Sequence, residues 1–230
     1  MNILIINQPP FNRGDESAHK GLIRTLLKRF PDAKIKVMHE AWLSESYRQY
    51  AVKDKRVEYF SEQQGCIKFP RFRNHDVFTN HTWLWKWHPT YRWTERIYKW
   101  ADIVVCAPGG ICMGGFQDWN HLYHLRLAQL FKRPLAYYGR SFGPFPTETE
   151  RNRQFKKISL DMLHYFGYLS IRDHKTELLA DELNIPYIST IDSAFLDSPK
   201  VEIPYELKSV VGNKPYMVFV PNYLLWHYAY

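Results

Sequence analysis

Several charged side chains stand just after short apolar runs, where a buried strand would end. Arg140 and Ser141 follow the run 135–138, and Arg172 follows the run 168–171. A guanidinium in such a position can grip a carboxylate or a phosphate through two parallel hydrogen bonds. Strand ends are also where parallel sheets bind their ligands. We therefore predict that Arg140, Ser141 and Arg172 contact a small anionic substrate.

Structural roles compete with this interpretation at two places. Arg172 is followed at once by Asp173, and an ion pair between the two is the leading alternative for both residues. Asp192 follows a further apolar run, 187–189, and it is also a candidate substrate contact. Its carboxylate could instead cap the turn that comes next.

The first apolar run of the chain leads into a polar turn. Asn12-Arg13-Gly14-Asp15-Glu16 stands directly before the first predicted helix. Gly14 permits a tight turn, and the free N–H groups at a helix start attract anions. Asn12 and Gly14 are therefore candidate substrate contacts. Capping of the helix by Asn12 or Asp15 is the more common role for such residues.

Another turn carries two pairs of glycines. Gly109-Gly110 and Gly114-Gly115 follow the run 103–106, and glycine lets the backbone approach a ligand closely. Gly109 and Gly110 are predicted substrate contacts. A flexible turn without a ligand is an equally weighted alternative.

Two histidines follow the glycine pairs. His121 and His124 stand three residues apart on a predicted helix, so they share one face and can both face a substrate. No third side chain stands at the spacing of a metal site. We predict no metal.

The composition favours a small anionic partner over a nucleic acid. Lys and Arg outnumber Asp and Glu by 31 to 23, which gives a net charge of +8 and a pI near 9.3. The basic residues are scattered, without a long basic block and without a zinc-finger or RNA-binding signature. An excess of positive charge of this kind attracts phosphorylated and carboxylated small molecules.

Nothing in the sequence predicts secretion or insertion into a membrane. The opening segment 1–7 is apolar for a few residues only and lacks a basic leader, so it is interpreted as a buried strand. No run approaches the roughly 18 apolar residues that span a bilayer. The three cysteines, an odd number, argue against a disulfide framework. We expect a cytoplasmic protein.

Short apolar runs alternate with helical patterns along the chain. Strands are predicted over 3–6, 35–38, 103–106, 135–138, 168–171 and 187–189, and helices over 18–30, 93–101, 120–132, 149–165 and 174–183. The strands are apolar on both faces, as in a parallel sheet covered by helices on both sides. The predicted fold class is therefore α/β, with a doubly wound, mostly parallel, Rossmann-like sheet.

The end of the chain has a different character. The segment 197–215 contains Pro, Gly and Ser at turn positions and predicts a linker, and 216–220 has the pattern of a new strand. Either the chain is a fragment, or this last strand joins the first sheet. We expect a Rossmann-like N-terminal domain over 1–200, and a linker with the first strand of a second domain over 201–230.

In order and spacing, these segments resemble the polysaccharide pyruvyl transferase family. The family's Gly-Asn-x-Gly-Asp turn is matched by 12–16, without the leading Gly, and its strand and double-glycine loop are matched by 101–110. Its Gly-Gln-Ser-Ile-Gly-Pro stretch is matched by 139–144, where Arg140 replaces the commoner Gln. Its Arg-Asp pair corresponds to 172–173 and its Asp-x-Ala-Phe segment to 192–195.

The resemblance implies transfer of pyruvate from phosphoenolpyruvate onto a sugar as a ketal, in surface polysaccharide biosynthesis. The implied partners are phosphoenolpyruvate and a glycan or lipid-linked sugar, with no further cofactor, no nucleic acid and at most a peripheral contact with the inner face of the membrane. It also implies two Rossmann-like domains of the GT-B type, so that 216–222 begins a second domain that carries part of the catalytic apparatus.

That chemistry needs cationic groups for the donor and a group that transfers protons. Arg140, Arg172 and the helix start after Gly14 are the expected anion clamps. Asp15, Glu16 and His121 are the candidates for proton transfer, since carboxylates and imidazoles titrate near neutral pH in suitable surroundings.

Aromatic residues offer one further candidate contact. Trp83, Trp85 and Trp87 alternate along 83–88, and sugar rings stack on such side chains. Packing inside the protein is the favoured interpretation for them, and helix core is favoured for Trp93.

Two other functions fit the same predicted architecture. A nucleotide-sugar glycosyltransferase of the GT-B type would bind its donor mainly on the second domain. A non-catalytic carbohydrate- or anion-binding module would show saturable binding without turnover. A nucleic-acid binder is a distant third and would bind with a steep salt dependence.

Overall fold

The computed structural model describes residues 1–8, 13–39, 51–61, 89–110, 112–196 and 205–212, together with Pro215 and Met217. Contacts divide the chain into two units, Met1–Asp197 and Ser198–Tyr230. The first unit holds the sheet and its helices. In the second, the structure describes one short helix, α8 (Tyr205–Val211), none of whose residues is buried.

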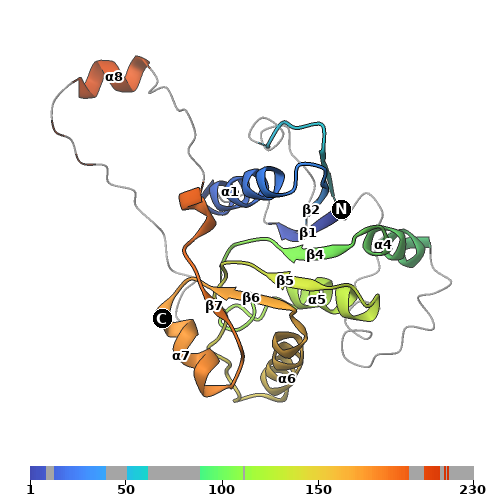
Figure 1. Cartoon of the computed structure of the whole chain (residues 1–230). Coiled ribbons are helices and arrows are strands. Elements are labelled where there is room, and N and C mark those ends of the chain that lie inside the picture. Colours follow the sequence, from blue (N-terminus) through green and yellow to red (C-terminus); the bar gives the residue numbers. More distant parts are fainter. Residues whose placement is uncertain are drawn as a thin grey trace. The chain divides into compact units, whose positions relative to one another are not determined.

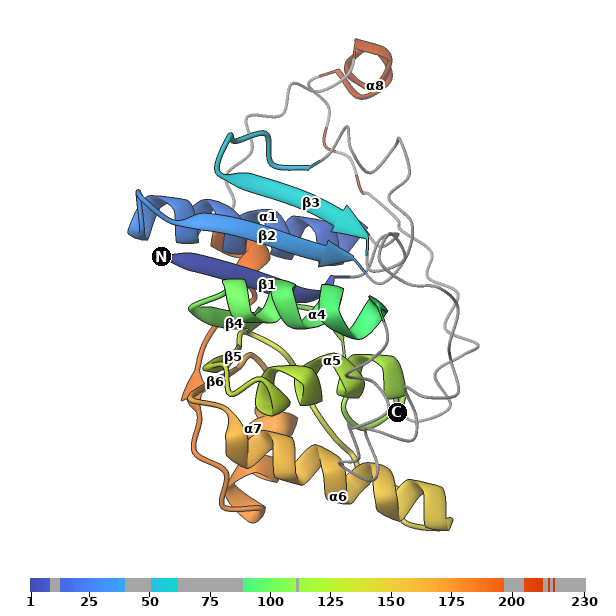
Figure 2. The same ribbon diagram turned by 90° about the vertical axis from the view of Figure 1, so that its right-hand side faces the viewer.

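Seven strands of the described chain form one parallel sheet in the order β3-β2-β1-β4-β5-β6-β7 (Figures 1 and 2). The strands are β1 (Asn2–Gln8), β2 (Lys34–His39), β3 (Val57–Ser61), β4 (Ile103–Cys106), β5 (Leu135–Tyr137), β6 (Tyr168–Ile171) and β7 (Ile188–Ser189). The order runs outward in one direction from β1 and in the other from β4. The sheet therefore has its topological switch point between β1 and β4, where sheets of this type bind ligands.

Helices cover both faces of the sheet. They are α1 (Arg13–Arg29), α4 (Pro89–Trp100), α5 (Trp119–Leu130), α6 (Glu150–Tyr165) and α7 (His174–Glu182), followed by the 3-10 turn η3 (Ser193–Leu196). Figure 2 shows α1 behind the sheet and α4, α5 and α6 in front of it. The fold is doubly wound, as the alternation of apolar runs and helical patterns predicts.

Alternating side chains of the strands build two separate apolar cores. In β1, Leu4 belongs to the core shared with α4, α5, α6 and α7, whereas Ile3 and Ile5 belong to the core under α1. All three are almost completely buried. Each such side chain contributes about 1.5–3 kcal/mol when it leaves water. A strand that is apolar on both faces is therefore held from both sides.

Polar residues start three of the helices. Asp118 accepts hydrogen bonds from the first free N–H groups of α5, Thr149 does so for α6, and Asp173 for α7. Each side chain replaces a partner that the first turn of a helix lacks. These caps fix where the loops after β4, β5 and β6 end.

The predicted elements are confirmed except near the edges of the sheet. The strand β3 escaped prediction, because it is short and Glu58 interrupts its apolar residues. The predicted strand at 187–189 forms as β7, but both of its residues are exposed. Within the linker expected over 197–215 the structure describes the short helix α8, none of whose residues is buried, and the linker stays a prediction. The strand predicted over 216–220 lies outside the described residues, apart from the exposed Met217.

Candidate active site

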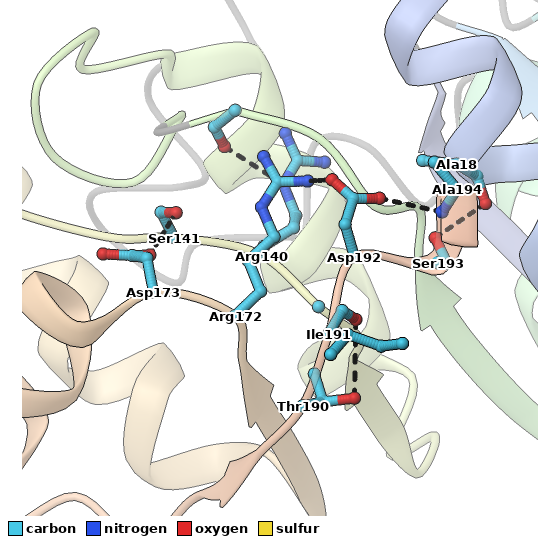
Figure 3. A network of polar contacts seen from close by, with 12 residues as sticks. Ala18, Arg140, Ser141, Arg172, Asp173, Thr190, Ile191, Asp192, Ser193 and Ala194 are labelled. Carbon is cyan, nitrogen blue, oxygen red and sulfur yellow. Dashed lines mark hydrogen bonds and ion pairs between the residues drawn. The ribbon is translucent and has the colours of Figure 1, made fainter. Parts of the chain in front are cut away.

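The start of α1 and the loops after β4, β5 and β6 lie at the edge of the sheet where the parallel strands end, and the chain after β7 joins them (Figure 1). From the edge strand β7, the chain runs back to α1, against which η3 packs (Figure 1). The hydroxyl of Ser193 donates to the carbonyl of Ala18 in α1, over 2.7 Å (Figure 3). This return path carries Asp192 over the strand ends.

Arg140, at the end of β5, is the most enclosed charged side chain of this region. It has no exposed surface. Its guanidinium donates to the carbonyl oxygens of Ala107 and Gly110, over 2.7 and 3.3 Å. It also donates to the sulfurs of Cys112 and Cys106, over 3.0 and 3.7 Å. Arg140 thus holds the loop that follows β4, and its contact with a substrate stays a prediction.

The double-glycine loop packs closely around this guanidinium. A Cβ atom on Gly109 would stand 3.1 Å from Nη2 of Arg140, tighter than most contacts of that kind. Gly110 supplies one of the carbonyls, and a Cβ atom there would meet nothing within 4 Å. The missing side chain of Gly109 thus leaves space for the guanidinium of Arg140, whereas a methyl group at Gly110 would fit without a collision.

Arg172, at the end of β6, has a different set of contacts. Its guanidinium forms an ion pair with the carboxylate of Asp192 (Figure 3). The Arg172 side chain is 23% exposed and that of Asp192 is 29% exposed. The alternative of an ion pair between Arg172 and its neighbour Asp173 is therefore wrong. Arg172 is the more accessible of the two arginines.

Asp192 has two roles at once. One carboxylate oxygen faces Arg172, and the other accepts from the backbone N–H of Ala194, over 2.9 Å. The cap predicted for the turn after Asp192 is confirmed by this second bond. Because η3 is anchored on α1 through Ser193, the position of Asp192 is tied to both sides of the switch point.

Ser141 and Asp173 form a second contact between neighbouring loops. The hydroxyl of Ser141 donates to Asp173, whose carboxylate also accepts from the backbone N–H of Thr176 (Figure 3). Burial raises the pKa of Asp173, but the hydrogen bonds from Ser141 and Thr176 outweigh it and leave the pKa below its ordinary value. Asp173 is therefore a charged cap that ties the β5 loop to α7.

Asp15 lies in the first turn of α1, near enough to Arg140 and Arg172 for their charges to act on its carboxyl group. It stands inside the helix, so its predicted role as a cap before the helix is wrong. Burial raises the pKa of Asp15 above its ordinary value, although the charges of Arg140 and Arg172 lower it. Asp192 adds to the upward shift. A carboxyl group whose burial outweighs the effect of nearby cations holds its proton to a higher pH than an exposed one.

The other predicted acids and bases lie elsewhere. Glu16 is buried and forms an ion pair with Lys20, one turn further along α1, over 3.2 Å. His121 is wholly buried in α5, with Nε2 3.8 Å from the sulfur of Cys106. Burial, together with the charge of Arg140, lowers the pKa of His121 well below its ordinary value. The structure thus places His121 beneath the loops as a neutral ring.

Gly14 is exposed in the first turn of α1. Asn12 lies outside the described residues, as do Trp83, Trp85 and Trp87. Trp93 packs against the core and meets Phe60 edge to face at 5.8 Å, which confirms its predicted place in the helix core.

The geometry agrees with the comparison with known protein families. The family model of the polysaccharide pyruvyl transferases matches residues 12–225, which is most of the chain. The chain belongs to the polysaccharide pyruvyl transferase family. No curated protein matches it.

Membership of the polysaccharide pyruvyl transferases makes this chain a transferase with a polysaccharide-type acceptor. The motifs quoted for the resemblance come to lie together at the switch point, at the start of α1 and after β4, β5, β6 and β7. None of the helices in the described ranges is long and apolar enough to cross a membrane. The same part of the chain holds no cluster of three or more His, Cys, Asp or Glu suited to a metal ion.

Two functional neighbours escaped the sequence prediction for this pyruvyl transferase. Cys106 and Cys112 contact Arg140. Burial lowers the pKa of Arg140, but the two sulfurs together with Tyr137 and Asp15 outweigh it and leave the pKa above its ordinary value. Counting cysteines gives no hint of this contact. A usable signal was available, since Cys106 ends a buried strand and Cys112 stands inside the double-glycine loop.

Proposed function

We propose that this pyruvyl transferase uses phosphoenolpyruvate as its donor and joins the pyruvate, as a ketal, to two hydroxyls of a glycan or lipid-linked sugar. The reaction would serve surface polysaccharide biosynthesis in the cytoplasm. The observation that supports the proposal is the convergence of Arg140, Arg172 and Asp15 at the switch point, where both cations act on the Asp15 carboxyl group.

The donor carries a carboxylate and a phosphate, and the two arginines suit it in different ways. Arg172 is accessible and takes the direct contact, because its planar guanidinium can bind either anionic group through two hydrogen bonds. Asp192 must then give up its place on Arg172. Arg140 is enclosed and contributes its charge from beneath. Such fixed charge costs no reorganisation when the reaction proceeds.

Asp15 is the acid that this arrangement provides. Protonation of the methylene carbon of phosphoenolpyruvate makes C2 electrophilic, and the first sugar hydroxyl adds there. The C–O bond to phosphate then breaks, and the second hydroxyl takes the place of phosphate. Of the two hydroxyl protons released, one restores the acid and the other leaves with the phosphate. The balance needs no cofactor beyond the donor.

The surroundings of Asp15 favour it over the two other candidates. An acid must hold its proton near the working pH, and burial raises the pKa of Asp15 in that direction. Glu16 forms an ion pair with Lys20, which favours its charged form. His121 is enclosed in the core, and its lowered pKa favours the neutral ring. We therefore propose that Asp15 donates the proton that the methylene carbon receives.

The test is release of inorganic phosphate from phosphoenolpyruvate by the full chain with a glycan or lipid-linked acceptor. Arg172→Gln should reduce both donor binding, measured by calorimetry, and phosphate release by at least about tenfold, the loss of roughly 1.4 kcal/mol that one charge-assisted contact supplies. Arg153→Gln, in an exposed pair with Glu150, is the matched control and should change neither. Turnover of a nucleotide sugar without phosphate release from phosphoenolpyruvate would overturn the proposal.

A further inference from the structure

One guanidinium in this fold lies against two cysteine sulfurs. Nη2 of Arg140 stands 3.0 Å from the sulfur of Cys112, and Nη1 stands 3.7 Å from the sulfur of Cys106. The first contact is the shorter one. The pair Arg140–Cys112 therefore joins the loop after β5 to the loop after β4.

Among the described residues, no carboxylate is in direct contact with the charge of Arg140. The side chain is completely buried, and its acceptors among the described residues are the carbonyls of Ala107 and Gly110 and the two sulfurs. Asp15 acts on it only over a longer distance. Burying a cation costs several kcal/mol unless an anion accompanies it. Of these four acceptors, only the sulfurs can become anions, and a neighbouring cation favours the thiolate form of cysteine.

The two cysteines differ in access. Cys106 has no exposed surface, whereas Cys112 is half-buried. The loop of Cys112 is held in place, because Met113 accepts from the backbone N–H of Gly143 over 2.7 Å. Cys112 is therefore the more accessible of the two cysteines, while its guanidinium partner is fully enclosed.

We propose that Cys112 is a thiolate stabilised by Arg140 and a site of covalent modification by small electrophiles, with peroxides as the natural class. The thiolate attacks one peroxide oxygen, an S–O bond forms and the O–O bond breaks. Hydroxide leaves and is protonated to water, while the sulfur loses two electrons and becomes a sulfenate. A sulfenate at Cys112 replaces the sulfur acceptor of Arg140 with a larger, oxygen-bearing group. Oxidation of Cys112 would thereby alter the position of Arg140 in the candidate active site.

The pH profile of alkylation tests the proposal without any turnover, so its outcome is separate from that of the proposed function. The full chain is treated with iodoacetamide between pH 5.5 and 9, and Cys112 is quantified by peptide mass spectrometry. In the urea-unfolded chain the same thiol has a pKa of about 8.5 and is roughly 1% thiolate at pH 6.5. We expect folded Cys112 to react at least about tenfold faster at that pH, after allowance for the weaker nucleophilicity of a stabilised thiolate.

The other titratable groups around this guanidinium are Cys106, Tyr137, His121 and Asp15. Cys106→Ser should leave the Cys112 profile in place, and treatment with hydrogen peroxide and dimedone should label Cys112 and spare Cys106. Arg140→Gln should return the midpoint to the ordinary range, and Arg140→Lys should keep part of the shift. If these variants fail to fold, the wild-type profile decides alone. A wild-type profile that follows the unfolded chain, or slower reaction at every pH, overturns the proposal.

Discussion

The guanidinium of Arg172 is held by the carboxylate of Asp192, twenty positions further along the chain and beyond the edge strand β7. Asp192 is in turn held by the backbone of Ala194, and the neighbouring Ser193 is bound to α1. The carboxylate of Asp192 thus pairs with Arg172, the more accessible of the two arginines of the candidate site. It stands where the carboxylate or phosphate of a donor would bind.

This contact predicts that Asp192→Asn tightens the binding of phosphoenolpyruvate. The internal competitor loses its charge, and a partly exposed ion pair of this kind contributes about 0.5–1 kcal/mol. The expected decrease in Kd is therefore roughly two- to fivefold, measured by calorimetry on the full chain. Asp161→Asn, in a surface pair with Arg126, is the matched control and should leave Kd unchanged. Weaker binding by Asp192→Asn would show instead that Asp192 positions Arg172 for the donor.

Asp15→Asn should separate binding from chemistry. The amide keeps the size of the side chain but carries no transferable proton, so phosphate release should fall by about 10²–10⁴-fold. Binding of phosphoenolpyruvate should persist, because the amide replaces a protonated carboxyl group of the same charge and nearly the same size. Equal losses in both measurements would contradict the role of an acid.

The pH dependence of turnover also tests whether Asp15 acts as an acid. An acid works only while protonated, so turnover should decline as the pH rises through the pKa of Asp15. Burial raises that pKa, and the decline should therefore begin above the ordinary range of an aspartate. The measurement is the initial rate of phosphate release across pH, at saturating donor and acceptor. A rate that increases over this interval would point to a base instead.

A cluster of rings from α1, β2 and β3, in which both histidines are buried, should make the fold sensitive to acid. His19, His39 and Tyr59 lie with ring centroids 6.1 to 6.4 Å apart. Burial lowers the pKa of His39 from 6.5 to about 4 and also lowers that of His19. Between these values the unfolded chain binds protons that the folded chain does not, so stability is full above pH 6.5 and is lost as the pH falls towards 4.

For His39 the lowering of the pKa from 6.5 to about 4 corresponds to roughly 3 kcal/mol of folding stability. Urea unfolding at pH 7 and pH 4.5 should show this loss in the wild type. His39→Gln should lose less between the two pH values, by roughly 2–3 kcal/mol. His164→Gln removes an exposed histidine and should keep the wild-type slope. Parallel slopes for the wild type and His39→Gln would contradict the prediction.

The sequence was sufficient for the order of the elements and for the edge of the sheet where the site lies. Apolar runs separated by helical patterns leave few ways to build a parallel sheet, so Arg140 and Arg172 could be placed at strand ends. The weakly apolar β3 could not be found in this way, because an edge strand needs only one buried face.

The partners of the site residues could not be predicted. The periodicity of a strand tells where Arg140 emerges, but its carbonyl and sulfur acceptors come from a loop about thirty residues earlier. Asp192 reaches Arg172 because the chain returns from β7 to α1, and no pattern of alternating elements encodes that return. The neighbouring Asp173, the obvious partner in the sequence, is used by Ser141 and by α7 instead.

Two glycines of the loop after β4 should differ in how much an alanine substitution lowers the free energy of unfolding. Gly114 has φ +143°, and a Cβ atom there would stand 2.4 Å from the backbone of Gly143 in the next loop. Gly110 has neither a positive φ nor an atom within 4 Å of such a Cβ. Gly114→Ala should therefore cost about 2 kcal/mol or more through backbone strain and the collision with Gly143, whereas Gly110→Ala should stay within about 0.5 kcal/mol of the wild type. Free energies of urea unfolding for the two variants check this. Similar values would mean that the two loops separate easily, and the contact that steadies Cys112 beside Arg140 would then be weak.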